Sequence, residues 1–380
     1  MSDQFTEVTT KGWGSRIMDS IKGVLIGLLM FIVSFGVLYW NEGRVNIALI
    51  AKTATEIESI SNPPAELEQK LISSTGVFQS TEKIGDFFLK EGDYIAIERN
   101  VEMYAWEEET HTKSEKNVGG SETTETTYTY KKEWTSIPAS SSNFKKPDGH
   151  QNPTMAISRN SVKVKKVKLG VYNVDMGQIT LPKYKTLQLN NSNVILNEDF
   201  QLASDEYLFK GKGTLNNAEI GDTRISYSTI YNPLDTATIF GKLDAKNKKI
   251  SPYYGTKNTK LYRVFEGTRD TAIVTMQTEY SVLTWILRAV GFLLMWFGLM
   301  ALFGPISVFL DVLPIFGTIG RVGIGIMTFI VSVVLSVITI IVSMIIHSLI
   351  ALLVVIGGVI IATIWYLKNK RKKQLVKSKE

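Results

Sequence analysis

The placement of long uncharged runs limits the fold of this chain more than any other feature. Residues 23–40, GVLIGLLMFIVSFGVLYW, form such a run between Lys22 and Glu42. About 20 apolar helical residues cross the ~30 Å hydrocarbon layer of a bilayer. The run ends in Tyr39 and Trp40, and aromatic residues of this kind lie at membrane interfaces. Because no small-x-small cleavage site follows, we predict a retained transmembrane helix over 23–40 rather than a cleaved signal peptide.

Three more spans are predicted near the carboxyl end. The second, 285–303, begins near Trp285, carries Arg288 close to the headgroups and ends at a Gly-Pro pair. Residues 322–367 have no formal charge, and as one helix they would be roughly 70 Å long, more than any bilayer needs. Ser343, His347 and Ser348 interrupt this run. We therefore predict a turn there and two spans, 322–343 and 348–367.

Charge assigns sides to these spans. The tail 368–380 has seven basic residues and one acidic residue, and basic segments stay in the cytoplasm. Four crossings place the tail 1–22 and the loop 304–321 in the same compartment. The segment 41–284 is then extracytoplasmic: periplasmic or outside the cell in a prokaryote, lumenal in a eukaryotic endomembrane.

The segment 41–284 is polar and long enough to bury a core of its own. Short runs typical of strands, such as 94–98, 126–134 and 225–230, alternate with Gly, Asn, Asp and Pro. The fold class predicted is four transmembrane α-helices, one N-terminal and three C-terminal, with a large β-rich (α+β) extracytoplasmic domain.

Finer features of the domain are also predicted. Residues 56–71 mix helix formers with a Pro-Pro break, which indicates two short helices. In VKVKKVKL, 162–169, a bulge at Lys165-Lys166 would bring the apolar residues to one face. The polar stretch 107–151 reads as a solvated hairpin tip or long loop, with a partner-binding flap as the alternative.

Few residues suit catalysis or metal binding. The chain has no cysteine, and its three histidines, His111, His150 and His347, are far apart, which argues against a metal site. No HExxH, GxSxG or P-loop pattern occurs. The net charge of +6 equals that of the tail 368–380, so the large polar domain is nearly neutral and unsuited to nucleic acid. We predict no enzyme activity, cofactor, metal or nucleic-acid partner.

Two features of the apolar segments allow alternatives. Asp311 lies in a Pro-interrupted apolar connection, where a carboxylate needs solvent or a partner, and Arg321 is the nearest basic residue in the sequence. We interpret Asp311 as a loop carboxylate facing the cytoplasm, with a proton or ion relay as the alternative. The small-xxx-small step Gly23 to Gly27 predicts a close helix contact.

Several segments, in one order along the chain, carry a resemblance to a known family. They are Asn41-Glu42-Gly43-Arg44, Val101–Trp106, Tyr128–Trp134, Asn143-Phe144, Gly149–Pro153, Gly221–Ser226, and Leu283–Gly291 followed by Leu310–Pro314. In these segments and in its span layout the chain resembles the LUMA family, also called transmembrane protein 43. The absence of cysteine and the Lys, Asn and Ile content suit a prokaryotic member.

The resemblance implies four spans, a large lumenal or extracytoplasmic domain and no established enzymatic activity. It places eukaryotic members in the endoplasmic reticulum and inner nuclear membrane, where they self-associate and contact envelope proteins. A prokaryotic member would lie in the cell membrane.

Together these features predict a non-enzymatic membrane-organising protein. It would form homo-oligomers and dock membrane lipids or membrane and envelope proteins through its extracytoplasmic domain. The alternative is a lipid-handling or transport protein whose β domain is a lid or conduit. The residues expected to serve interaction or structure are Asn41, Glu42, Gly43, Arg44, Trp106, His150, Asn152, Asp222, Arg224, Trp285, Arg288, Asp311 and Pro314. Among them, Glu42 is expected to pair with Arg288 or with headgroups.

Overall fold

The structure is a computed structural model that describes residues 3–197, 199–312, 314–348, 353, 356–361 and 363–365, with 314–319 described by their backbone only. Part of the predicted fourth span, 348–367, and all of the tail 368–380 lie outside the described residues. The chain divides into two compact units. Unit 1 comprises Met1–Val8, Val45–Lys113 and Thr124–Tyr280, and unit 2 comprises Thr9–Arg44, Ser114–Thr123 and Ser281–Glu380.

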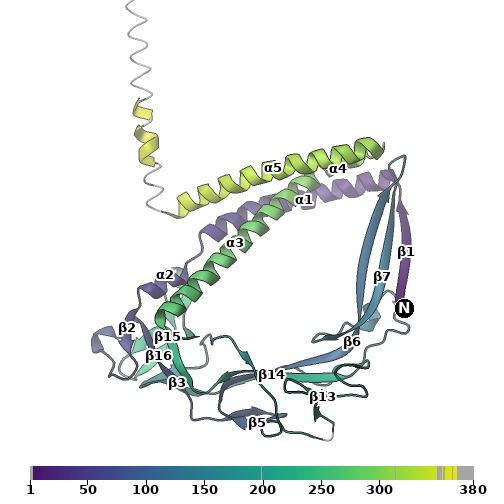
Figure 1. Ribbon diagram of the computed structural model, residues 1–380. Helices are drawn as coiled ribbons and strands as arrows, with labels where there is room; N and C mark the ends of the chain where they lie inside the picture. Colours follow the sequence, from purple (N-terminus) through teal and green to yellow (C-terminus); the bar gives the residue numbers. More distant parts are fainter. Residues whose placement is uncertain are drawn as a thin grey trace, which may run out of the picture. The chain divides into compact units, whose positions relative to one another are not determined.

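The described elements are five α-helices, three 3-10 helices and nineteen strands (Figure 1). The helices are α1 (Trp13–Glu42), α2 (Ile47–Lys52), α3 (Arg269–Leu302), α4 (Gly304–Leu310), α5 (Pro314–His347), η1 (Ala65–Leu67), η2 (Ser141–Asn143) and η3 (Thr256–Asn258). One sheet has eight strands: β1 (Asp3–Lys11), β6 (Tyr94–Lys116), β7 (Glu122–Thr135), β8 (Asn160–Lys163), β11 (Lys185–Thr186), β12 (Gln201–Leu202), β13 (Leu208–Lys210) and β14 (Thr223–Tyr231). A second has seven: β2 (Thr55–Glu58), β3 (Leu71–Gln79), β9 (Lys166–Leu169), β10 (Tyr172–Asp175), β15 (Leu234–Asp244), β16 (Lys249–Ser251) and β19 (Arg263–Glu266). Two further pairs are β4 (Ile84–Asp86) with β5 (Leu89–Gly92) and β17 (Tyr253–Tyr254) with β18 (Lys260–Leu261).

The β-rich domain is confirmed, and its strands show why it folds. The predicted strands 94–98, 126–134 and 225–230 lie in β6, β7 and β14. Strands β6 and β14 pair antiparallel, with Val101 opposite Ile225, and both side chains are buried. Apolar side chains two residues apart point to one face of a strand, so this register puts them into a shared core.

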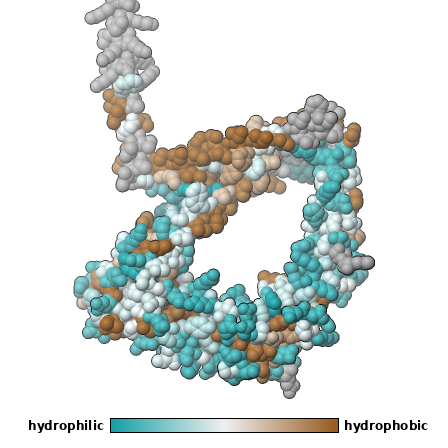
Figure 2. Space-filling model, viewed as in Figure 1, coloured by the Kyte–Doolittle hydropathy of each residue, from teal (hydrophilic) through white to brown (hydrophobic). Residues whose placement is uncertain are grey.

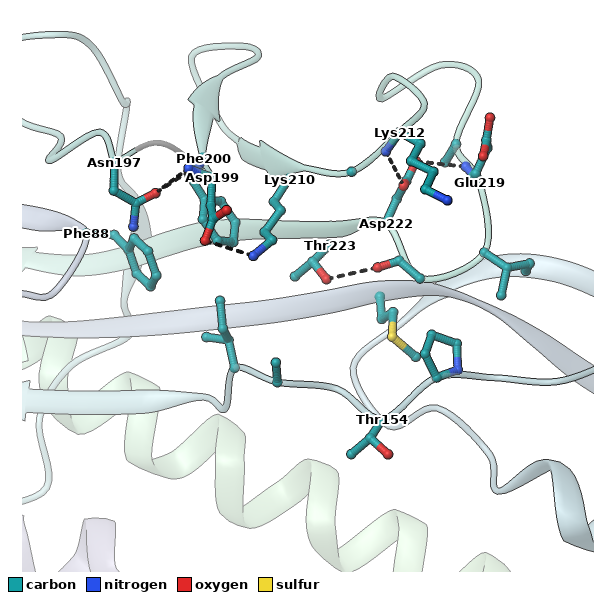
Figure 3. A pocket seen from close by; sticks show the side chains of 18 of the residues that line it. Phe88, Thr154, Asn197, Asp199, Phe200, Lys210, Lys212, Glu219, Asp222 and Thr223 are labelled. Atoms are coloured by element: carbon teal, nitrogen blue, oxygen red, sulfur yellow. Dashed lines mark hydrogen bonds and ion pairs between the residues drawn. The ribbon is translucent and has the colours of Figure 1, made fainter.

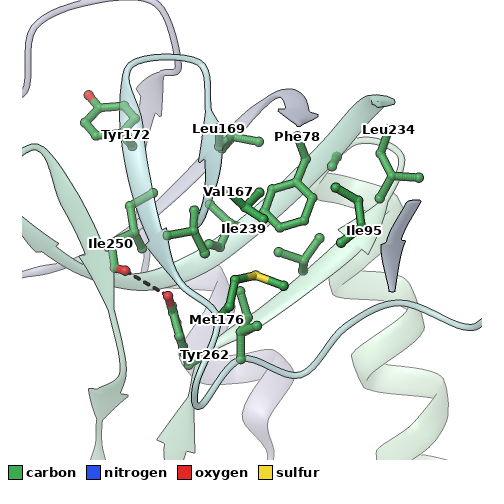
Figure 4. Close-up of a cluster of buried hydrophobic side chains, with 14 of the residues drawn as sticks. Phe78, Ile95, Val167, Leu169, Tyr172, Met176, Leu234, Ile239, Ile250 and Tyr262 are labelled. Atoms are coloured by element: carbon green, nitrogen blue, oxygen red, sulfur yellow. Dashed lines mark hydrogen bonds between the residues drawn. The ribbon is translucent and has the colours of Figure 1, made fainter. Parts of the chain in front are cut away.

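The larger core of unit 1 joins strands of both large sheets. Ile95 of β6 packs with Phe78 of β3 and Ile239 of β15, and all three are fully buried (Figure 4). The Tyr262 hydroxyl at the edge of this core donates to the Ile250 carbonyl oxygen at 2.8 Å. Each fully buried large apolar side chain contributes roughly 1.5–3 kcal/mol, so this cluster is a principal source of stability.

Two local predictions in unit 1 are wrong. The segment 162–169 has no bulge that keeps it in one sheet; β8 pairs with β6 in the eight-stranded sheet, and β9 pairs with β10 and β3 in the seven-stranded sheet. The chain changes sheets at Lys165, and Val164 before this change and Val167 after it are buried in the same core. Residues 56–71 hold the strand β2 and the short η1 instead of two helices, because β2 pairs in parallel with β3.

The amino-terminal tail is not a free tail. Strand β1 adjoins β7 at the edge of the eight-stranded sheet, and Gln4 and Thr6 bond the side chains of Thr129 and Thr127. The residue number on β7 falls as the residue number on β1 rises, so the two strands run antiparallel. The segment 1–22, predicted as an amino-terminal tail, therefore contains β1 and the start of α1. Residues 3–11 contain threonine, valine and phenylalanine, which favour a strand.

Unit 2 contains the apolar helices. Three helices, which begin at Trp13, Arg269 and Gly320, are long and apolar enough to cross a membrane by length and composition. They bear exposed apolar side chains along their length, among them Leu25, Ile32 and Ile330 (Figure 2). The structure thus describes three candidate spans where four were predicted.

The helices extend beyond the predicted spans. α1 begins at Trp13 instead of residue 23, α3 begins at Arg269 instead of 285, and α5 begins at Pro314 instead of 322. The predicted spans followed the uncharged apolar runs, whereas the helices also include polar turns before these runs. The added turns of α3 stay in unit 1, where Ile273 and Met276 are buried in a core with Phe240.

The predicted close helix contact holds for Gly27 but not for Gly23. A Cβ added at Gly27 would lie 2.7 Å from the Ala301 Cβ and 2.8 Å from the Gly298 carbonyl oxygen, whereas one added at Gly23 would meet nothing within 4 Å. We expect Gly27→Val to force α1 from α3 and to lower stability by about 1–3 kcal/mol, as overpacking does. Gly23→Val is the matched control, since it makes the same change in an open position. Thermal unfolding in detergent measures both, and equal melting temperatures for the two variants would contradict the prediction.

Candidate functional site

The predicted residues Asn41 to Arg44 lie together in unit 2, where α1 ends beside α3. Glu42 accepts two hydrogen bonds from Arg288, each at 2.8 Å, and its side chain is 5% exposed. Asn41 donates to the Thr284 carbonyl oxygen, and Arg44 donates to the Thr284 hydroxyl at 2.8 Å. The predicted pair of Glu42 and Arg288 is thus present. Such a bidentate pair is stronger and more directional than a single bond.

The end of α5 completes this group of contacts. The His347 ring lies 4.6 Å from the Tyr39 ring, centre to centre, and Ser343 donates to the Tyr39 carbonyl oxygen at 3.1 Å. A Cβ added at Gly43 would lie 2.3 Å from His347 Nε2, so a larger residue there requires the His347 ring to move. The exposed ring of Trp285 lies under Arg288, with the guanidinium carbon 5.0 Å from its centre. We call Asn41–Arg44, Thr284, Arg288 and His347 the Glu42 cluster.

A second group of charges in unit 2 surrounds Asp311, which follows α4. Asp311 is 1% exposed, and its Oδ2 lies 2.6 Å from an Arg16 nitrogen and 2.5 Å from Lys116 Nζ. Arg321 lies 3.7 Å from Oδ1. Arg16 also pairs with Glu122 at 2.9 Å. We call these five residues the Asp311 cluster.

Hydrogen bonds to backbone groups also join the start of α1, the tip of the β6–β7 hairpin and the segment around α4. Arg16 of α1 donates to the Gly120 carbonyl oxygen at 2.5 Å, and the Gly119 N–H donates to the Val312 carbonyl oxygen at 3.2 Å. Trp13 donates from its indole nitrogen to the Val308 carbonyl oxygen at 3.0 Å. Residues 114–123, the tip of the β6–β7 hairpin, therefore contact both the start of α1 and the connection after α4.

These contacts correct two predictions. Asp311 is neither a solvent-facing loop carboxylate nor one member of a chain of acids; it is buried among three cations. The hairpin tip and the loop 304–321 were assigned to opposite sides of the membrane, yet Lys116 and Asp311 are in direct contact. This contact could not be predicted from local sequence patterns, because the two segments lie almost 200 residues apart. Pro314 is the first residue of α5.

Three other predicted residues come together in unit 1. The His150 ring stacks on Tyr130 at 3.8 Å and meets Trp106 edge-on at 4.7 Å. Its Nε2 lies 2.8 Å from Asp3 Oδ2, and its Nδ1 lies 2.9 Å from the Lys146 carbonyl oxygen. Asn152 brackets Trp106: it accepts from the Trp106 N–H at 2.7 Å and donates to the Trp106 carbonyl oxygen at 2.9 Å.

Tyr130, which the sequence did not single out, gives this cluster a pH dependence. Burial raises the pKa of Tyr130 to about 12, and its hydrogen bond to Glu108 adds to the rise. In the unfolded chain the Tyr130 hydroxyl ionises near pH 10. The contribution of Tyr130 to the free energy of unfolding is therefore complete below pH 10 and is lost as the pH rises through 12.

Tyr130→Phe removes one group that loses its proton at a lower pH in the unfolded chain than in the folded protein. We therefore expect the unfolding free energy to fall less steeply between pH 10 and 12 in this variant, by up to about 1.4 kcal/mol per pH unit. Denaturant unfolding of both proteins across this range measures the slopes. Tyr227 and Tyr262, whose pKa values are also raised by burial, remain in both proteins and serve as the internal reference. Identical slopes would show that Tyr130 does not titrate with unfolding.

Asp222 and Arg224 are held by local contacts. The Asp222 carboxylate accepts from the backbone N–H groups of Lys212, Gly213 and Glu219 at 2.8–3.1 Å. Arg224 pairs with Glu102 at 2.7 Å, and its guanidinium carbon lies 4.5 Å from the ring centres of Trp134 and Tyr207. Both residues therefore shape the loop and sheet around them.

Asp222 also forms part of the wall of a cavity of about 1060 Å³ in unit 1 (Figure 3). Phe88 and Phe200 also line it, and their ring centres lie 4.9 Å apart. Asp199 and Lys210 pair at 2.9 Å beside them. The lining mixes apolar, basic and acidic groups, so the cavity suits an amphipathic ligand better than a wholly apolar one.

Groups of three or more His, Cys, Asp or Glu that could hold a metal ion are absent from the described part of the chain. Sequence reasoning missed Arg16, Lys116 and Glu122 of the Asp311 cluster. The signal for Arg16 was present, since a cation one or two turns before an apolar run needs an anion or solvent.

Known proteins resemble this chain over most of its length. The family model of transmembrane protein 43 matches residues 103–349. The chain is 26% identical over 349 residues to transmembrane protein 43 of Mus musculus, and the match covers 84% of this chain and 83% of that protein. It is 25% identical over 349 residues to the protein of Homo sapiens, with the same coverage, and 28% identical over 291 residues to the homolog of Drosophila melanogaster, covering 72% and 74%.

No solved structure matches the chain. The family model covers well over half of the 380 residues, and the relatives match over most of their length. The chain belongs to the transmembrane protein 43 family.

Proposed function

We propose that this chain is a non-enzymatic, membrane-organising protein that self-associates through its apolar helices and docks lipids or membrane proteins. One observation carries the proposal. The ionisable groups that the sequence offered for chemistry are engaged in holding segments together: Glu42 with Arg288, Asp311 with Arg16 and Lys116, and Asp222 with three backbone N–H groups. Groups bound in this way stabilise an arrangement and are not poised to exchange protons with a substrate.

The apolar helices supply a surface for self-association. On α5, a Cβ added at Gly323 meets nothing within 4 Å, and Ile326 and Ile330 are exposed nearby. Small residues on an uncovered helix face allow another helix to approach closely.

Crosslinking in native membranes, followed by mass spectrometry of the linked species, tests the proposal. We expect a homo-oligomer that Gly323→Leu weakens at least tenfold. Val322→Leu is the matched control, because it replaces one exposed apolar side chain by another on the next residue. A chain that stays monomeric in native membranes and links to no protein would refute the organising function.

The cavity in unit 1 supports the alternative function, lipid handling, because its volume of about 1060 Å³ admits a large amphipathic molecule. Mass spectrometry of gently extracted protein separates the two functions. Stoichiometric lipid lost on substitution of Phe88→Asp would favour lipid handling, and no bound lipid would favour the organiser.

The location also belongs to this proposal. The basic tail 368–380 favours a cytoplasmic carboxyl end, in the cell membrane of a prokaryote or in the endoplasmic reticulum or inner nuclear membrane of a eukaryote. The arrangement of four crossings with a cytoplasmic amino end remains a prediction from the sequence.

A further inference from the structure

The cavity in unit 1 has an apolar end, where Phe88 and Phe200 lie (Figure 3). Phe87 also lines the cavity; its side chain is 71% exposed, and its ring centre lies 4.9 Å from that of Phe88. The Ile195 N–H donates to the Phe88 carbonyl oxygen at 2.9 Å, so the exposed side chains of Ile195 and Leu196 lie close to this end. Single exposed apolar residues are ordinary, but several together are typical of a surface that binds a ligand or partner.

The other end of the cavity is formed by the loop between β13 and β14, which Asp222 holds in place (Figure 3). The Asp222 carboxylate is buried and accepts from the backbone N–H groups of Lys212 and Glu219 at 2.9 and 2.8 Å. One buried carboxylate therefore fixes the two backbone positions from which a lysine and a glutamate side chain project. A cation and an anion are in this way placed a short distance apart.

These two side chains are available to a ligand, whereas the other charges nearby are already engaged. Asp222 is satisfied by backbone donors, and Asp199 pairs with Lys210 at 2.9 Å. Lys212 and Glu219 are both exposed, and within the described residues no ion pair engages either side chain. A ligand that reaches this end can therefore contact both charges without breaking an existing pair.

The balance of charge decides among ligand classes. The described lining contains three lysines and three acidic residues, so its formal net charge is zero. An anionic headgroup would be attracted by Lys212 but repelled by Glu219, and a cationic headgroup would experience the reverse. A zwitterionic phosphoester headgroup satisfies both residues, because its phosphate pairs with the lysine and its ammonium group pairs with the glutamate.

We propose that this cavity binds one amphiphile with a zwitterionic phosphoester headgroup. The headgroup lies between Lys212 and Glu219, and the apolar chain lies on Phe87, Phe88 and Phe200. The cavity volume of about 1060 Å³ is at the upper end of the ~300–1,000 Å³ of small-molecule sites, which suits a single ligand of this kind. The inference rests on lipid handling, the second function proposed above, and names the class of lipid for it.

Equilibrium dialysis of the full chain in nanodiscs of phosphatidylglycerol tests the inference, since this anionic host lipid has no zwitterionic headgroup to compete. The probes are decylphosphocholine, decyl phosphate and decyltrimethylammonium, each below its critical micelle concentration, with empty nanodiscs as background. We expect one decylphosphocholine per chain, bound roughly tenfold or more tightly than the other two probes. Phosphocholine without the decyl chain should also bind at least roughly tenfold more weakly, because it cannot bury apolar surface on the phenylalanines.

Charge exchange identifies the headgroup contacts. Lys212→Glu and Glu219→Lys should each weaken decylphosphocholine binding roughly tenfold. The double variant Lys212→Glu with Glu219→Lys should recover part of the affinity, because a zwitterion can bind in the reversed sense. Lys246→Glu is the matched control, since Lys246 is also exposed but does not line the cavity, and it should bind like the parent protein.

The results separate this inference from the function on which it rests. Lipid retained on gentle extraction, together with equal affinity for the three probes, would overturn the inference and leave lipid handling in place. No retained lipid and no binding of any probe would overturn both. Equal affinity of Lys212→Glu and the parent protein for decylphosphocholine would show that the headgroup does not bind at this loop, and the inference would again be wrong.

Discussion

Asp311→Asn is expected to release the hairpin tip from the helices of unit 2. The substitution leaves Arg16, 5% exposed, and Lys116, 20% exposed, without their shared carboxylate. Removal of one partner from a buried charged group costs about 3–5 kcal/mol. Arg16 keeps its pair with Glu122, so the loss falls mainly on Lys116 and the lower part of that range is expected. We expect the population with a released tip to rise roughly 100-fold or more. Limited trypsin digestion at Lys116, with the protein in its native membrane, measures this release.

Asp19→Asn is the matched control for this prediction. Asp19 also pairs with two cations, Lys11 and Lys22, but its side chain is 48% exposed, and water and salt screen such pairs. Trypsin sensitivity at Lys116 should not change in this variant. If Asp311→Asn is as resistant as the parent protein, the tip is held by other contacts and the role given to Asp311 is wrong.

Glu42→Lys is expected to separate the end of α1 from α3. It replaces a bidentate pair, with two bonds of 2.8 Å to Arg288, by two cations at the same place. Both side chains are largely buried, so we expect a loss of about 3–5 kcal/mol in unfolding free energy and weaker assembly. Thermal unfolding in detergent, size on detergent chromatography and protease sensitivity measure these effects.

The double variant Glu42→Arg with Arg288→Glu tests the cause. It restores opposite charges in exchanged positions, and partial recovery of the melting temperature would show that pairing is responsible. Glu266→Lys, which disrupts the exposed pair with Lys185, should leave the melting temperature unchanged. Equal stability of Glu42→Lys and the parent protein would show that the pair contributes nothing measurable.

Local patterns predicted many parts of the fold. Alternating apolar residues located β6, β7 and β14, and apolar runs located the lipid-facing parts of α1, α3 and α5. The pairing of Glu42 with Arg288 was also accessible, because both charges flank apolar runs that meet the same interface. Each of these predictions depends on residues close in sequence or on one simple constraint, the thickness of a bilayer.

Other parts could not be predicted from local patterns. The switch between sheets at Lys165 and the pairing of β1 with β7 depend on which distant strand offers a free edge. The Asp311 cluster joins residues 16, 116, 122, 311 and 321. A buried carboxylate requires partners, but its charge alone does not select them among 42 lysines and arginines.

The sequence by itself indicated a β-rich membrane protein, because hydropathy and strand periodicity are local properties of the chain, and its motifs carried the resemblance to the transmembrane protein 43 family. Only the tertiary structure decided which segments meet at the ends of the apolar helices. Those meetings are fixed by the need of buried charges for opposite charges and of buried backbone groups for hydrogen bonds. The partners that satisfy Asp311 and Arg16 lie on a hairpin about 100 residues from one and almost 200 from the other, and only the folded chain brings them together.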